Sequence, residues 1–340
     1  LDRWLVTPRS LVLELLRDTE TFTTASDASP IRSTFGPQML STDGDAQKNH
    51  RAPFAPGFRP RVVGREFAAG IAGRCDELVD ALAPGGDDLA PFASNLAVMT
   101  VADVLGLRVD DPGRIKEWYD DLAAALANVM RDPDIAERAR ATAEVVRSLV
   151  GDAGMVARLA GPLERAAVDS NILLILFGGI ETAESMIVNA VWALLSHPEA
   201  VERVRRDPGL IPSAVEESLR WEPAVQTLTR YATRDAELGG VTIRRGDIVE
   251  GMIGGANRDP EHFADPDRFD VTRANARDLT FGYGKHTCIG IHLARLQAQT
   301  TIRTLLDSLP GLRLDAERPS RPRGHEFRKV RPLWVTWDAT

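Results

Sequence analysis

Cys288 is the residue in this sequence with the clearest potential for chemistry. It stands in the segment FGYGKHTCIG, residues 281–290, and apolar residues recur at helical spacing directly after it. Cys288 is therefore expected at or just before a helix N-terminus, where free backbone amides and the helix dipole stabilise a thiolate. The other cysteine, Cys75, is distant and no paired Cys/His spacing exists, so zinc and iron–sulfur clusters lack ligands. A single thiolate can still hold a haem iron.

The segment around Cys288 resembles the haem-binding signature of the cytochrome P-450 family. The signature positions are matched by Phe281, Gly282, Gly284, His286, Cys288, Gly290, Leu293, Ala294 and Arg295. The resemblance implies that Cys288 is the metal ligand, bound to the iron of haem b. It also implies that the cofactor is contacted in this loop by Phe281, Gly282, His286 and Gly290. For Cys288 taken alone, a buried structural cysteine at a helix start is the alternative.

A second informative segment is the apolar run Asn171–Leu195, which predicts a buried helix. Its middle reads FGGIET. Two interior glycines, Gly178 and Gly179, cost roughly 1 kcal/mol each relative to alanine, and a buried carboxylate is costly unless it is paired or lines a wet cavity. The segment looks like the family's oxygen-binding helix, with the glycines against the haem and Glu181 and Thr182 as the catalytic acid and alcohol. The alternative is a helix kink whose threonine bonds back to a carbonyl.

Two further motifs resemble the structural triad of the same family. Glu217 and Arg220 lie three residues apart on a predicted helix, Pro212–Trp221, and match its ExxR motif. Arg268, in the sequence PDRF, matches the later PxRF element that supplies the third member. Because a planar guanidinium binds a carboxylate through two hydrogen bonds, this triad is expected to brace the thiolate loop.

Two arginines match positions at which family members bind the haem propionates. These are Arg51, in the segment Ser41–Phe58, and Arg230, just ahead of a predicted hairpin. Gln47 falls where many members have a histidine. For Arg51 alone, a solvated surface arginine is the alternative.

Composition limits the class of protein. The 340 residues are 44% hydrophobic and 26% charged, which is ordinary for a soluble globular protein, and the net charge of −8 argues against a nucleic-acid partner. Two cysteines cannot form a disulfide framework, which suits the cytoplasm. The longest apolar run, Ile172–Ile180, is too short to span a membrane, and no basic leader with a cleavage site is present.

Apolar periodicity predicts a mainly α fold. Helical spacing covers Pro8–Phe22, Arg61–Ala83, Leu89–Leu107, Arg114–Val150, Asn171–Leu195 and Pro212–Trp221. SHPE at Ser196–Glu199 predicts a capping box, and Gly239-Gly240 predicts a hairpin turn within Ala236–Val249. The resemblance implies one cytochrome P-450 domain over residues 1–340, a helical domain with a small β region enclosing haem. Because the chain opens at Leu1, the family's N-terminal segment is expected to be missing.

The resemblance implies a bacterial-type haem-thiolate monooxygenase that activates O2 and oxidises a small lipophilic molecule in secondary metabolism. Its pocket is expected around Pro30–Phe35, Ile175, Gly178 and Val225–Leu228. No flavin or nicotinamide motif occurs, so electrons must come from a partner, a ferredoxin with its reductase, docking near Cys288. Candidate cations for that docking are Arg61, Arg65, Lys285 and Arg295.

Two other functions are alternatives to this one. A catalytically silent haem-binding homologue, acting as a protein partner, is disfavoured by the intact Glu181 and Thr182. A cysteine hydrolase using Cys288 and His286 would leave the matched arginines and the buried glycines unexplained.

Overall fold

The computed structural model describes residues 3–107, 112–128, 132–149, 163–274 and 278–338. Its helices are α1 Arg9–Arg17, α2 Pro30–Phe35, α3 Gly44–Arg51, α4 Pro60–Asp80, α5 Ala90–Leu105, α6 Pro112–Leu126, α7 Pro133–Leu149, α9 Arg165–Leu195, α10 Pro198–Arg206, α11 Ile211–Trp221, α12 Ile253–Ala256 and α13 Ile291–Ser308. A short 3-10 helix, η3, spans Gly284–His286. The predicted mainly α fold is confirmed.

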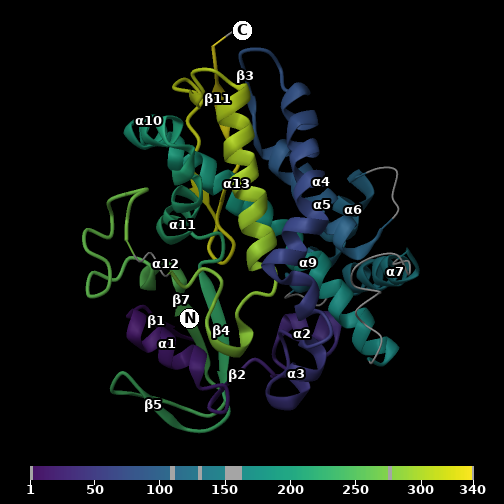
Figure 1. Cartoon of the computed structure of the whole chain (residues 1–340). Coiled ribbons are helices and arrows are strands. Elements are labelled where there is room, and N and C mark those ends of the chain that lie inside the picture. Colours follow the sequence, from purple (N-terminus) through teal and green to yellow (C-terminus); the bar gives the residue numbers. More distant parts are fainter. Residues whose placement is uncertain (1–2, 108–111, 129–131, 150–162, 275–277, 339–340) are drawn as a thin grey trace.

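The strands form small sheets at the edges of the helical body. They are β1 Arg3–Val6, β2 Phe22–Thr23, β3 Gly86–Asp88, β4 Thr227–Ala232, β5 Ala236–Leu238, β6 Val241–Ile243, β7 Ile248–Met252, β8 Arg313–Leu314, β9 Pro322–Arg323, β10 Lys329–Val330 and β11 Trp334–Thr336. The largest sheet has the order β1-β7-β4-β2, with β1 parallel to β7 and the other pairs antiparallel. It lies at the lower end of the molecule, beside α1 and apart from the long helices (Figure 1).

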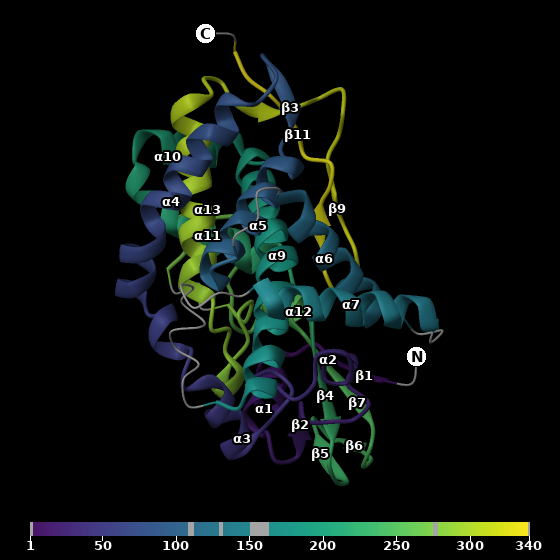
Figure 2. The same ribbon diagram turned by 90° about the vertical axis from the view of Figure 1, so that its right-hand side faces the viewer.

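Helix α9 is the centre of the fold. It runs through the middle of the molecule with α5 packed along it, and it also contacts α11 and α13 (Figure 2). By length and composition α9 could cross a membrane, but 67% of its most apolar window is buried inside the protein. Its residues are apolar nearly all round because neighbouring helices surround it. α9 is the core helix against which the site is built.

The predicted helix over Arg114–Val150 is wrong as a single element. The structure has two helices there, α6 and α7, which pack against each other; Val150 lies outside the described residues. Asn128 and the backbone of Asp132 exchange hydrogen bonds of 2.8 Å across the connection. Pro133 then opens α7, at a position where proline's missing N–H costs nothing.

The predicted capping box at Ser196 is also wrong. Ser196 is the C-cap of α9, and its hydroxyl donates to the Trp192 carbonyl at 2.8 Å; α10 begins at Pro198 without a side-chain cap. A serine hydroxyl can bond back to the preceding turn as readily as it caps the next helix. The hairpin at Gly239-Gly240 is confirmed, since both glycines have positive φ (60° and 78°) between β5 and β6.

Candidate haem site

Cys288 lies in a tightly turned loop that leads into α13. The Cys288 amide donates to the Phe281 carbonyl at 2.9 Å, which closes the loop on itself. Gly282 and Gly284 have φ values of +71° and +75°, a conformation that other residues rarely adopt. Gly290 is the N-cap of α13. The expected position of the thiol, just ahead of a helix N-terminus, is therefore what the structure shows.

The environment of the Cys288 thiol combines burial with positive charge. The side chain is exposed over part of its surface, whereas protein surrounds the rest of it, and this burial raises the pKa of the thiol. A backbone hydrogen bond from Gly290 and the charges of Arg51 and Arg295 lower that pKa. Cys75 contrasts with it, because that thiol is fully buried in α4 and burial raises its pKa to about 11. Of the two cysteines, Cys288 is the one that can offer a thiolate to a ligand.

Helix α3 braces the thiolate loop from the side. Arg51 Nη2 donates to the Thr287 carbonyl at 2.7 Å, and Gln47 Nε2 donates to the Lys285 carbonyl at 2.9 Å. Gln47 is buried, so the residue that replaces the family's usual histidine holds the loop backbone. The structure thus brings Arg51 to the backbone of the thiolate loop, and its predicted contact with a haem propionate stays a prediction.

His286 contacts the half-buried carboxylate of Asp43, and the charge of Asp43 also acts on Arg230. His286 Nε2 lies 2.7 Å from Asp43 Oδ1. Burial alone would raise the pKa of Asp43, but hydrogen bonds from His286, Thr23 and the Thr24 backbone outweigh it and lower the pKa to about 2. The buried Arg230 guanidinium also feels the Asp43 charge, while burial lowers the pKa of Arg230 to about 10.

Two buried nitrogens in this cluster have no hydrogen-bond partner among the described residues. They are Nε of Arg230 and Nδ1 of His286. A buried guanidinium N–H that lacks a partner is costly, and a carboxylate is the acceptor that suits it best. His286 would offer a second such donor at Nδ1 when both of its ring nitrogens carry a proton. The two propionate groups of a haem would supply such acceptors. The residues around Cys288 therefore fit haem b.

On α9 the structure separates the roles of the two predicted haem-contacting glycines. A Cβ atom added to Gly178 would meet nothing within 4 Å, whereas one added to Gly179 would lie 2.6 Å from Val101 Cγ2 on α5. Gly178 faces open space, as a residue beside a cofactor should. Gly179 permits the close packing of α5 on α9, and its predicted contact with the haem stays a prediction.

The acid and alcohol of α9 have defined partners. The Thr182 hydroxyl donates to the Gly178 carbonyl at 2.6 Å, the bond that a kink-forming threonine would make. Glu181 accepts a hydrogen bond from the Tyr119 hydroxyl at 3.0 Å and forms an ion pair of 2.8 Å with Lys329. Tyr119 and Lys329 were not predicted, because each comes from a segment far from Glu181 in the sequence.

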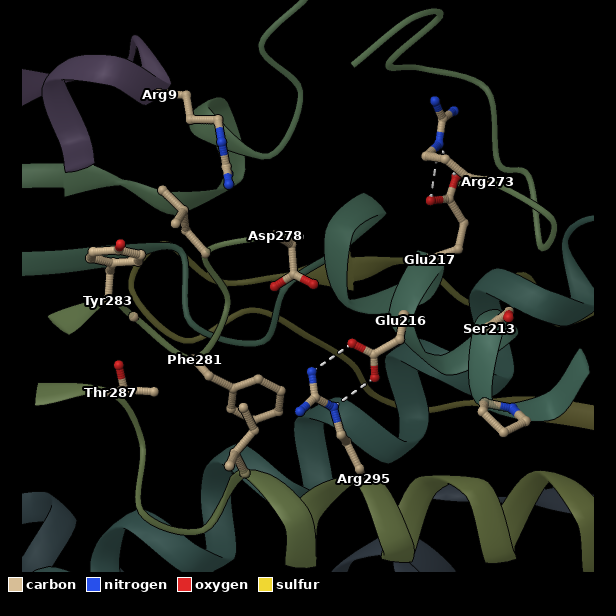
Figure 3. A pocket seen from close by; sticks show the side chains of 14 residues that line it. Arg9, Ser213, Glu216, Glu217, Arg273, Asp278, Phe281, Tyr283, Thr287 and Arg295 are labelled. Carbon is tan, nitrogen blue, oxygen red and sulfur yellow. Dashed lines mark hydrogen bonds and ion pairs between the residues drawn. The ribbon is translucent and has the colours of Figure 1, made fainter. Parts of the chain in front are cut away.

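The structural triad is present, but its third side chain differs from the predicted one. Glu217 and Arg220 are fully buried and joined by two hydrogen bonds of 2.8 Å. The third side chain is Arg273, whose Nε lies 3.1 and 3.2 Å from the Glu217 oxygens (Figure 3). Arg268, the predicted third member, contributes only its backbone carbonyl, which accepts bonds from Arg220 and Arg273. Its side chain is 67% exposed and points to Asp270 at 3.9 Å.

A cavity of about 420 Å³ lies between this triad and the thiolate loop. Figure 3 shows Glu217, Glu216 and Asp278 on one side of it and Phe281, Tyr283 and Thr287 on the other. Arg295, from α13, crosses the gap to Glu216 with two bonds of 2.7 and 2.6 Å. The cavity therefore lies behind the thiolate loop, and the ion pair of Arg295 with Glu216 joins α13 to α11.

Comparisons with known proteins agree with this geometry. A sequence model described as Cytochrome P450 matches residues 209–311. The "Biotin biosynthesis cytochrome P450" of Bacillus subtilis (strain 168) is 36% identical over 269 residues, covering 74% of this chain and 67% of that protein. The "Steroid C26-monooxygenase" of Mycobacterium tuberculosis (strain CDC 1551 / Oshkosh) is 32% identical over 336 residues, covering 92% and 88%.

The chain belongs to the cytochrome P450 family. A solved structure of the same family confirms the fold of this P450. It is P450BioI in complex with an acyl carrier protein ligated to hexadec-9Z-enoic acid, with a TM-score of 0.88 and 30% sequence identity over 99% of this chain and 92% of that one. The P450 is a bacterial-type monooxygenase that uses haem b, O2, a lipophilic substrate and electrons from a redox partner.

Proposed function

We propose that Cys288 holds the haem iron as a thiolate and that Arg51, Arg230 and His286 bind the haem propionates. One observation carries this assignment. The thiol stands two residues after His286 in a loop that is held by its own backbone and by α3, and the Asp43 neighbours His286 and Arg230 each have a buried nitrogen without a partner among the described residues. Phe281, Gly282 and Gly290 shape the loop, and Gly178 leaves space for the cofactor on the α9 side. Glu217, Arg220 and Arg273 brace the loop from behind.

The proposed chemistry divides between the cofactor and the side chains of α9. When bound, a thiolate-ligated haem supplies the electron density that favours O–O cleavage and oxygen insertion into a C–H bond. Thr182 positions a water molecule through its hydroxyl group. Glu181 takes up a proton at its carboxylate and passes it on toward that water. Arg295 and the triad keep the loop rigid, so the thiol stays at one place during turnover.

The substrate is proposed to be lipophilic. Phe177, on α9, packs against Phe35, Tyr119 and Phe327 with ring centroids 5.7 to 6.2 Å apart, which gives this region an aromatic wall. Phe35 belongs to α2 and Phe327 pairs with Val225, so the two predicted pocket segments converge on α9. The names of the two relatives refer to biotin biosynthesis and to a steroid carbon, which suggests aliphatic chains and steroids as the first probes.

The electron donor is proposed to be an acidic ferredoxin with its reductase, in the cytoplasm. Arg61, Arg65 and Lys285 are exposed and suit an acidic partner. Arg295, a fourth candidate, is half-buried and committed to Glu216, so it contributes less to a docking surface.

Thr182→Ala tests the proposed catalytic role. Ligand-induced shifts of the haem spectrum first identify a bound molecule, and product, oxygen consumed and hydrogen peroxide are then measured together. The variant is expected to bind haem and accept electrons, but to release hydrogen peroxide in place of product. Without the Thr182 hydroxyl, the proton needed for O–O cleavage arrives too slowly, and the reduced oxygen leaves in protonated form as hydrogen peroxide. Ser185→Ala is the matched control, since this buried serine lies on the same helix and its hydroxyl has no partner among the described residues.

Undiminished product per electron in Thr182→Ala would reduce Thr182 to a kink residue. Wild type that consumes electrons without forming product from any bound molecule would favour the catalytically silent homologue. Wild type supplied with hydrogen peroxide alone is a further control, because a peroxide-driven enzyme would need no electron donor.

A further inference from the structure

Two acidic residues of α9, Glu181 and Glu184, share one lysine, Lys329, from the hairpin formed by β9 and β10. Lys329 Nζ lies 2.8 Å from Glu181 Oε1 and 3.1 Å from Glu184 Oε1. All three side chains are largely buried, with exposed fractions of 18%, 14% and 1%. Charges in such a site interact strongly, because little water screens them, and removing one partner leaves an uncompensated charge.

The second oxygen of Glu181 is held from the opposite side. Tyr119, on α6, donates its hydroxyl to Glu181 Oε2 at 3.0 Å, and its ring stacks on Phe177 one helical turn earlier. Burial and the neighbouring Glu181 charge raise the pKa of Tyr119, so the phenol stays protonated and remains a donor. Both carboxylate oxygens are thus engaged by groups other than Thr182, whose hydroxyl is bonded to Gly178.

The hairpin that carries Lys329 also reaches the aromatic wall. Phe327, two residues before Lys329, meets Phe177 edge-on at 6.2 Å and pairs with Val225 of the expected pocket segment. The same short segment therefore contacts the substrate side of α9 through a ring and the acid of α9 through an ammonium group. A molecule that shifts the backbone at Phe327 would also shift Lys329, because the two residues are two positions apart in the same segment.

We propose that Lys329 is a positioning residue: together with Tyr119 it holds Glu181 in a resting position, and substrate contact at Phe327 loosens this hold so that Glu181 can serve Thr182. The proposal rests on the proton-delivery role given to Glu181 above. It explains why a catalytic acid is ion-paired to a lysine from a distant segment. It also gives the β9–β10 hairpin a function beyond lining the pocket.

Substitutions at Lys329 test the proposal. Lys329→Met removes the ammonium group and Lys329→Arg keeps a cation. Arg331→Gln is the matched control, because Arg331 is a cation shortly after β10 and, among the described residues, its one ion pair is with Glu184, at 3.6 Å. Tyr119→Phe provides a second perturbation of Glu181 that removes one hydroxyl group, should Lys329→Met fold poorly.

The first measurement needs no turnover. Infrared difference spectra of the ferric enzyme, with Glu181→Gln used to assign the band, report the Glu181 carboxylate at neutral pH. In Lys329→Met the ionised band should give way to a protonated carboxyl band, since Glu184 then faces Glu181 without the cation between them. Lys329→Arg and Arg331→Gln should keep the ionised band. An unchanged band in both Lys329→Met and Tyr119→Phe would overturn the proposal.

The second measurement is oxygen consumption without substrate. It should rise in Lys329→Met by about tenfold, which corresponds to about 1.4 kcal/mol of lost restraint, and stay at the wild-type level in Arg331→Gln. Equal rates in the two variants would contradict the proposal. Glu181→Gln distinguishes the proton-delivery role of Glu181 from the contact by which Lys329 holds it. If it leaves product yield intact, the proton role fails even where the infrared result shows that Lys329 holds Glu181.

Discussion

The membership of Arg273 in the triad predicts that its loss destabilises the protein far more than loss of Arg268. Glu217 is 1% exposed and accepts bonds from Arg220, from the Asp270 amide and from Arg273. Arg273 also donates to three backbone carbonyls, those of Ala264, Asp265 and Arg268. Breaking a buried ion pair costs about 3–5 kcal/mol. Because Glu217 keeps its other partners, the lower end applies, and Arg273→Met should cost about 3 kcal/mol.

The loss of unfolding free energy expected at Arg268 is much smaller. Its side chain is 67% exposed and lies 3.9 Å from Asp270, and exposed pairs of this kind contribute about 0–1 kcal/mol. Arg268→Met should therefore cost less than about 1 kcal/mol. Urea unfolding followed by circular dichroism measures both variants, and a double-mutant cycle with Glu217→Gln isolates the pair. Equal losses in the two variants, or no coupling between Arg273 and Glu217, would refute the assignment.

Two further predictions follow from the site. Gly178→Ala should be neutral or raise the free energy of unfolding by up to about 1 kcal/mol, because alanine favours the helix and its methyl group meets no protein atom of the described residues within 4 Å. Gly179→Ala should lower the free energy of unfolding by about 1–3 kcal/mol through the contact with Val101. Thermal unfolding that ranks the two variants in the opposite order would contradict the packing. Reduction by an acidic ferredoxin, measured by stopped flow, should slow as salt rises and slow again in Lys285→Gln, while Arg140→Gln on α7 has no effect; a rate indifferent to ionic strength would exclude electrostatic docking near the loop.

The elements that carry strong local signals could be predicted from the sequence. The glycine-turned loop before α13, the apolar α9 and the Gly239-Gly240 hairpin each depend on residues that are close together in the chain. The local sequence pattern gave a wrong prediction where it fits two different structures equally well. A serine two residues before a proline fits the C-cap of one helix as well as the N-cap of the next. The local pattern therefore assigns Ser196 to α10, although it ends α9. Helical spacing also continued past the break between α6 and α7.

The partners of the site residues could not be predicted, because they depend on tertiary contacts. Arg268 and Arg273 are both arginines near the end of the same segment, and only the path of the loop decides which one reaches Glu217. Lys329 and Tyr119 meet Glu181 from distant segments. Gly179 carried the same helix-breaking signal as Gly178, although it faces α5. Residue type and spacing thus predicted the chemistry, while packing determined which side chains support it.

The most direct test of the account is the carbon monoxide difference spectrum of the reduced protein. Wild type should give the strongly red-shifted Soret band of a thiolate-ligated haem, and Cys75→Ala should keep it, because Cys75 is buried in α4. Cys288→Ser should lose this band, since a neutral hydroxyl group cannot replace the anionic sulfur donor. A Cys288→Ser variant with an unchanged spectrum would show that Cys288 is not the iron ligand.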